Sequence, residues 1–263
     1  MTREPDPNPY ATPTARVLSN DMHAAFVQSR RLAPWAWTRW YAHGWEQFID
    51  NPFAWMGATF AFVVICAVVL IVPLGQLAAQ ALQFIFLGGL LLGCREHDAG
   101  GHFGFRYLFE GFASHGGQLA LIGVLCTAAF IGFFLLVGVG VGISGLALSL
   151  ADWTSFASLT HAAIPALALL VVLLIFLSVL GMAVWFAPAL VVLYGVSAMS
   201  ALKMSYQGFL RNVIPLTFFG LVWIFFALCA SLLLGLGYLV LIPVTIGAVY
   251  ASTREVFDAS VAS

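Results

Sequence analysis

The chain has 263 residues, of which 62% are hydrophobic and only 8% are charged, and its mean hydropathy is +1.00. This composition is typical of integral membrane proteins and argues against a water-soluble domain. The formal net charge is −1, so there is no excess of positive charge to neutralise phosphates, and nucleic acid is excluded as a partner.

Residues 1–34 are polar at the start and lack the apolar core of a signal peptide. Proline recurs through the first part of this segment and interrupts regular structure. These prolines are Pro5, Pro7, Pro9 and Pro13. We therefore expect a flexible cytoplasmic tail over 1–34.

Residues 35–50 have the pattern of an amphipathic helix. Large aromatic side chains recur on one helical face, and charged residues occupy another. The aromatic residues are Trp37, Tyr41, Trp45 and Phe48. Because Trp and Tyr favour the headgroup zone, we expect these four residues to anchor an interfacial helix. Docking against another protein is the alternative.

Four stretches then lack Asp, Glu, Lys and Arg altogether, and each is longer than the roughly 20 residues that cross a bilayer as a helix. They cover 53–94, 118–151, 153–202 and 212–253. We predict an all-α polytopic membrane protein with about six transmembrane helices, paired as three helical hairpins at about 53–94, 118–195 and 213–251. The expected spans are 54–74, 76–94, 118–148, 162–195, 213–234 and 237–251.

A short aromatic and glycine-containing element precedes each expected hairpin, at 44–48, 109–112 and 206–209. This recurrence predicts three copies of one unit, an interfacial helix followed by a hairpin, all pointing the same way. The three interfacial helices are expected at about 37–50, 105–115 and 203–211. Inverted repeats, which are common in transporters, would alternate in direction.

Every Lys and Arg falls on one side of the six expected spans. The positive-inside rule makes that side cytoplasmic, so both termini are expected inside. A single integral membrane domain then covers 35–255, and 256–263 forms a short cytoplasmic tail.

Four segments stand out between residues 86 and 212: the stretch FLGGLLLGCREHDAGG at 86–101, YLFEGF at 107–112, FAPAL at 186–190 and the pair Arg211-Asn212. With these segments the chain resembles a family of uncharacterised proteobacterial inner-membrane proteins. The resemblance covers about 44–255. It implies a Gram-negative inner membrane and a six-helix fold, and it implies no established activity.

Three glutamines, Gln76, Gln80 and Gln83, fall on one face of the second expected span. An amide inside the membrane needs a hydrogen-bond partner, because an unsatisfied polar group in lipid costs several kcal/mol. Hydrogen bonding between helices is one interpretation. A polar lining to a cavity that opens outward is the other.

No catalytic constellation, metal-ligand spacing or cofactor motif is recognisable. Cys94, His97, His102 and His115 surround the first expected cytoplasmic loop, but their spacing matches no common metal site. We therefore expect no enzyme activity, no metal and no cofactor. The expected function is a non-catalytic scaffold or accessory subunit that binds membrane proteins or lipid. The alternative is a transporter or channel for a small or amphipathic solute, although the spans lack the acidic and basic residues that usually mark coupled transport.

Overall fold

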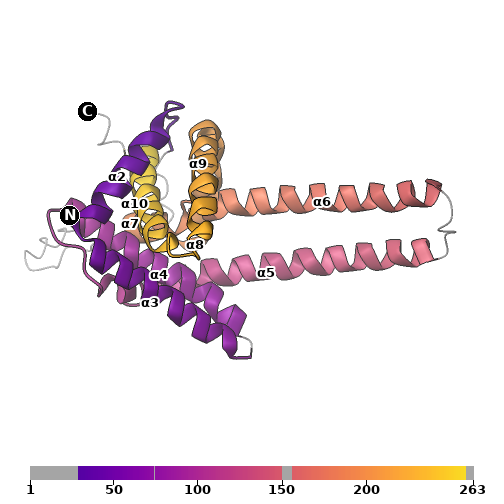
Figure 1. Ribbon diagram of the computed structural model, residues 1–263, viewed down its shortest axis with the longest axis horizontal. Helices are drawn as coiled ribbons and strands as arrows, with labels where there is room; N and C mark the ends of the chain where they lie inside the picture. Colours follow the sequence, from indigo (N-terminus) through magenta and orange to yellow (C-terminus); the bar gives the residue numbers. More distant parts are fainter. Residues whose placement is uncertain (1–28, 74, 150–155, 259–263) are drawn as a thin grey trace, which may run out of the picture.

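The computed structural model describes residues 29–73, 75–149 and 156–258, with side chains outside 141–163, and these residues form helices joined by short connections (Figure 1). The helices are α2 (Ala36–Asp50), α3 (Pro52–Ile71), α4 (Gly75–Asp98), α5 (Tyr107–Ser149), α6 (Phe156–Val184), α7 (Ala187–Tyr194), α8 (Ala198–Arg211), α9 (Val213–Leu232) and α10 (Tyr238–Phe257). Within these described ranges, six segments are long and apolar enough to cross a membrane. The prediction of an all-α polytopic membrane protein is confirmed.

The long helices pack in consecutive pairs, α3 with α4, α5 with α6, and α9 with α10. The turn between α9 and α10 reverses the chain sharply, because Leu234 and Gly235 both have positive φ, at 54° and 82°. Figure 1 shows that α5 and α6 run side by side and extend away from all the other helices.

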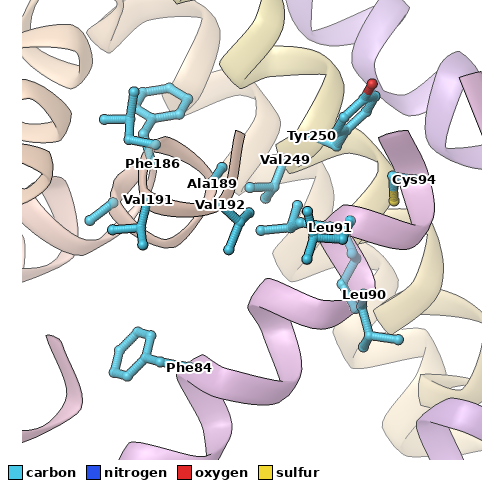
Figure 2. Packing of buried hydrophobic residues seen from close by; sticks show 14 of the residues in the cluster. Phe84, Leu90, Leu91, Cys94, Phe186, Ala189, Val191, Val192, Val249 and Tyr250 are labelled. Carbon is cyan, nitrogen blue, oxygen red and sulfur yellow. The ribbon is translucent and has the colours of Figure 1, made fainter. Parts of the chain in front are cut away.

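The centre of the fold is the short helix α7, whose first six residues are all buried. It contacts α4, α5, α8 and α10. In Figure 2, Ala189 and Val192 of α7 lie beside Leu91 of α4 and Val249 of α10. Most of the buried apolar side chains belong to this cluster, which we call the base, made of α2, α4, α7, α8, α10 and the starts of α3, α5 and α9.

Each of the three short amphipathic segments packs against a long helix of a pair other than the one that it precedes in the chain. The start of α5 packs on α4, α8 packs on the end of α6 and on α7, and α2 packs on α10. The last contact joins the first described helix to the last, so the chain closes on itself. This cyclic arrangement explains why a similar aromatic and glycine-containing element recurs before each pair.

The fourth expected span, 162–195, corresponds to a candidate span at Ile164–Tyr194, but the helix within it breaks after Val184 and restarts as α7. Pro188, in the first turn of α7, has no N–H to donate, and its ring would clash with the carbonyl of residue 184 in a continuous helix. The Ser205 hydroxyl of α8 bridges this break. It accepts a hydrogen bond from the Phe186 N–H at 2.9 Å and donates one to the Met182 carbonyl at 2.9 Å.

Helix boundaries differ from the prediction at three other places. The expected interfacial helix at 105–115 is continuous with the span that follows, and only a non-helical His115 (φ −138°, ψ 23°) kinks α5 between them. Helix α8 begins at Ala198, five residues before the expected 203. Helix α10 extends to Phe257, which is buried, so the packed domain continues past residue 255.

The described end of the predicted flexible tail is held in place by hydrogen bonds. Arg30 donates its backbone N–H to the Val256 carbonyl, and Leu32 donates its N–H to the Asn212 side chain at 2.8 Å. The Asn212 amide in turn donates to the Arg30 carbonyl at 2.9 Å. The segment from residue 29 therefore belongs to the base, and the rest of the predicted tail lies outside the described residues.

Candidate functional site

Helix α2 crosses α10 at a point where both helices carry glycine. A Cβ added to Gly44 would lie 2.2 Å from the Val244 carbonyl oxygen, and one added to Gly247 would lie 2.7 Å from the Gly44 Cα. Only residues without side chains allow two helix backbones to approach so closely. This crossing holds α2 against α10 and leaves a depression on each side of it.

The first depression is an apolar groove between α2, α9 and α10, with a volume of about 740 Å³. From Val222 to Leu233 it follows α9 for about 16 Å, at 1.5 Å of rise per residue. Its floor and walls are almost entirely hydrocarbon. The residues that line it are Trp37, Thr38, Tyr41, Ala42, Trp45, Val222, Phe226, Cys229, Ala230, Leu233, Gly237, Val240, Leu241 and Val244.

Three of the four predicted interfacial anchors line this apolar groove. Tyr41 stacks on Phe219 with ring centroids 4.5 Å apart, and its hydroxyl donates to the Phe219 carbonyl at 3.0 Å. Burial raises the pKa of Tyr41, so the phenol stays neutral. Trp37 and Trp45 stand one turn away on either side. Their indole rings therefore form part of the groove wall on α2.

The fourth predicted anchor, Phe48, lies in the core instead of at the surface. The buried face of α2 contains Ala36, Trp40, Gly44 and Gln47, and Phe48 packs at the edge of that face. Phe48 was predicted to belong to the aromatic stripe because it falls at helical spacing from Trp37, Tyr41 and Trp45. Burial follows from the close crossing at Gly44, which turns the neighbouring residues of α2 toward α10 and α4.

The second depression is a charged pocket of about 600 Å³ on the other side of α2, between α2, α10 and the end of α4. Its hub is the Asp98 carboxylate. One carboxylate oxygen accepts a hydrogen bond from Gln47 at 3.0 Å and lies 3.3 Å from His43. The other oxygen pairs with Arg254 at 2.9 Å. Asp98 thus connects three helices at the end of the base where the charged residues gather.

A second ion pair closes the same pocket at its other end. The Glu255 carboxylate pairs with Arg39 and accepts a hydrogen bond from the Trp40 indole at 2.7 Å. Glu46 also lines the pocket, and among the described residues it forms no ion pair. The pocket therefore contains two arginines that are already ion-paired and one exposed carboxylate, that of Glu46.

Sequence reasoning missed this network because its members lie far apart in the chain. Residues 43 and 98 are joined only by the fold. Two signals were visible in the sequence. His43 and Gln47 share a helical face, and the dense charge of the Arg95-Glu96-His97-Asp98 stretch follows a span that has no charge of its own. Neither signal identifies Arg254 as the partner.

The structure places the glutamine row at the opposite end of α4. Gln76 and Gln80 line a groove of about 710 Å³ between α4 and α5, together with Thr127 and several apolar residues. Gln83 is exposed and does not line it. Among the described residues, none of the three side chains hydrogen-bonds to another helix. The row is therefore split, with two amides in a groove and one outside it.

The predicted histidines and cysteine of the first loop do not come together as ligands. His97 pairs with Asp50 at 2.9 Å, and Cys94 is buried in the core. Within the part of the chain that the structure describes, no group of three or more His, Cys, Asp or Glu side chains is arranged to hold a metal ion. The polar groups at this end form ion pairs that hold helices together.

Comparison with known proteins gives no relative: no family model, no curated protein and no solved structure matches this chain.

Proposed function

We propose that this protein is a non-catalytic component of a bacterial inner membrane, a scaffold or accessory subunit that binds a partner membrane protein along α5 and α6. The observation that carries the proposal is the shape of this helix pair. We call its projecting part the arm, defined as residues 127–149 of α5 and 156–181 of α6. Of the arm side chains that the structure describes, only Phe133 is buried, by stacking on Phe176 at 4.1 Å.

The length of the arm supports a partner. Helix α6 has 29 residues and is about 44 Å long, whereas the hydrocarbon core is about 30 Å thick. Helices α3, α9 and α10 have 20 residues each and match that thickness. To stay within the hydrocarbon, α6 would tilt by roughly 45°, which is more than transmembrane helices usually do. Packing against neighbouring helices sets such tilts. Among the described helices, α4 lines a groove with Thr127–Leu135 at one end of the arm, and the rest of the arm extends away from the other helices.

The base supports the same function, because its polar groups serve to hold helices together. Asp98, Glu255 and Ser205 each join two or more helices. A base fastened in this way presents the arm at a fixed angle. This is what a scaffold requires.

Site-specific photocrosslinking tests the proposal. A photoreactive amino acid at Leu135 or Leu136, both exposed in the arm, should give one discrete protein adduct in native membranes. The same amino acid at Phe225 or Leu228, exposed on α9, is the matched control and should give lipid adducts only. Lipid adducts alone from the arm positions would contradict the proposal.

A second candidate function, transport of a small or amphipathic solute, is favoured by the groove that Gln76 and Gln80 line. The variant Gln80→Leu separates the two functions. If the protein is a scaffold, the variant should keep its partner, and its free energy of unfolding should change by about 1 kcal/mol or less. Loss of a measurable flux in a correctly folded Gln80→Leu protein would favour the transporter instead.

The proposed orientation places both termini and the charged end of the base at the cytoplasmic side, in agreement with the position of every Lys and Arg on one side. Cysteine labelling in spheroplasts tests it, in a background without the natural cysteines. Leu234→Cys, at the α9–α10 turn, should react with an impermeant reagent from outside. Ala99→Cys, after α4, should react only once the membrane is opened. The reverse pattern would overturn the orientation.

A further inference from the structure

We infer that the apolar groove and the charged pocket on either side of α2 form one binding site for a zwitterionic phospholipid that carries a primary ammonium headgroup. An acyl chain would occupy the apolar groove, and the headgroup would cross α2 into the charged pocket. The site involves no residue of the arm, so it stands or fails independently of the proposed partner binding.

Lipid is the occupant that the position of the apolar groove selects. Two of its walls, α9 and α10, are membrane-spanning segments, so the groove faces hydrocarbon. The third wall is α2, whose Trp37 and Trp45 are of the residue type that is enriched at the headgroup level. A chain that enters beside α2 and follows α9 toward Leu233 therefore begins at the interface and runs into the bilayer.

Ala42 connects the groove and the pocket, because it lines both. It is exposed on α2, and its methyl group is the smallest obstacle that a side chain can present. Residues three and four positions apart are neighbours on a helix surface. Ala42 therefore has Arg39 and Glu46 beside it on the pocket side and Thr38 and Trp45 beside it on the groove side.

The charges around Ala42 favour a zwitterion over an anionic lipid. Both arginines of the pocket are already paired, Arg39 with Glu255 and Arg254 with Asp98. A phosphate can still approach Arg39, whose side chain is 55% exposed. The ammonium of the same headgroup then reaches Glu46, the carboxylate without a described ion pair. An anionic headgroup would leave Glu46 unpaired and bring a like charge toward it.

The passage over Ala42 gives a specific test. Full-length protein in a mild detergent is mixed with dioleoylphosphatidylethanolamine or dioleoylphosphatidylglycerol, and native mass spectrometry measures the retained lipid. The wild type should retain the ethanolamine lipid more tightly. Ala42→Trp should weaken that retention about tenfold, because the indole ring would block the passage between the apolar groove and the charged pocket. Ala42→Ser, of similar size to alanine, is the matched control and should retain the lipid like the wild type.

Glu46→Gln tests the ammonium contact separately. It should reduce the preference for the ethanolamine lipid about threefold, as expected for one exposed ion pair. Retention of the glycerol lipid should not fall, because the variant also removes the like charge that its headgroup approaches. The melting temperature without added lipid should stay constant in all three variants, because both residues are exposed. Tighter retention of the glycerol lipid by the wild type would overturn the headgroup assignment. Equal retention by Ala42→Trp and the wild type would overturn the site.

Discussion

The base and the arm both contain apolar membrane-spanning sequence, yet they use it in opposite ways. Over 18 strongly apolar residues of α4, and likewise of α10, 61% are buried inside the protein, whereas none is buried over the corresponding 18 residues of Ile164–Tyr194. The difference lies in the small and polar residues. In the base, glycines allow close crossings and polar side chains join helices. In the arm, glycines such as Gly132 and Gly138 face open space, and Ser178 and Thr127 bond only to their own helices.

Removal of a large core side chain should show the difference most strongly. Trp55 is 1% exposed, stacks on Phe103 at 3.7 Å and donates to the Gln47 carbonyl. Trp55→Ala should lower the free energy of unfolding by about 3–5 kcal/mol. Phe134→Ala, in the exposed arm, should change it by less than about 0.5 kcal/mol. Unfolding by SDS from mild-detergent micelles measures both, and equal losses would remove the distinction.

Alanine at glycine positions should give opposite signs in the two regions. Gly44→Ala puts a methyl group against the Val244 carbonyl oxygen, and the overpacking should cost about 2–3 kcal/mol. Gly132→Ala meets nothing within 4 Å and should be neutral or stabilise its helix by up to about 1 kcal/mol. The same SDS titration compares the two proteins. A stable Gly44→Ala variant would show that the α2–α10 crossing is looser than the structure has it.

The two regions should also respond differently to loss of a serine hydroxyl. Ser205→Ala leaves the buried Phe186 N–H without its acceptor, so the free energy of unfolding should fall by about 1–3 kcal/mol. Ser178→Ala removes a bond to the Leu174 carbonyl of the same helix and should have almost no effect. If Ser205→Ala is as stable as the wild type, another group must accept the hydrogen bond from the Phe186 N–H.

The ion pairs at the charged end of the base should contribute least to the free energy of unfolding. Asp98→Asn weakens the pair with Arg254 and the contact with His43, and it should cost about 1 kcal/mol because both partners are partly solvated. Asp50→Asn, whose carboxylate is exposed beside His97, should cost less. Thermal unfolding of the purified variants at low and high salt provides the comparison, and the Asp98 effect should shrink as salt screens it. A loss that is independent of salt would argue against an electrostatic role.

The sequence was sufficient for the spans, because a run without charge has few other physical explanations. It also located the amphipathic segment at 35–50, which is α2. It could not show which face of α2 is buried, because the stripe of Trp37 and Tyr41 and the face of Trp40 and Gly44 both follow helical spacing. The choice depends on the α2–α10 crossing, which brings together residues about 200 positions apart. The break before α7 was visible as Pro188, but its repair by Ser205 was not.

The arm was harder to foresee for a different reason. The expected spans 118–148 and 162–195 are longer than the other expected spans, and length alone does not say whether a helix bends, tilts or projects. The structure shows that α5 and α6 run side by side and extend away from the other helices, while the start of α5 packs on α4 and the end of α6 packs on α8. The identity of whatever covers them follows from no residue pattern, because lipid and a partner helix both favour apolar side chains.

Trimming the arm to the thickness of a bilayer tests the central claim most directly. Deletion of 134–140 and 169–175 removes about two turns from each helix at the same level and keeps the contact between Phe133 and Phe176. Helix α6 shortens to about 33 Å, close to the other spans. The photoreactive amino acid is placed at Leu167, which is exposed in the arm and remains in the trimmed protein. The trimmed protein should keep the free energy of unfolding of the base, within about 0.5 kcal/mol, and lose the discrete adduct that the full-length protein gives from this position. Retention of the partner, or collapse of the base, would contradict a self-sufficient base that carries a partner-binding arm.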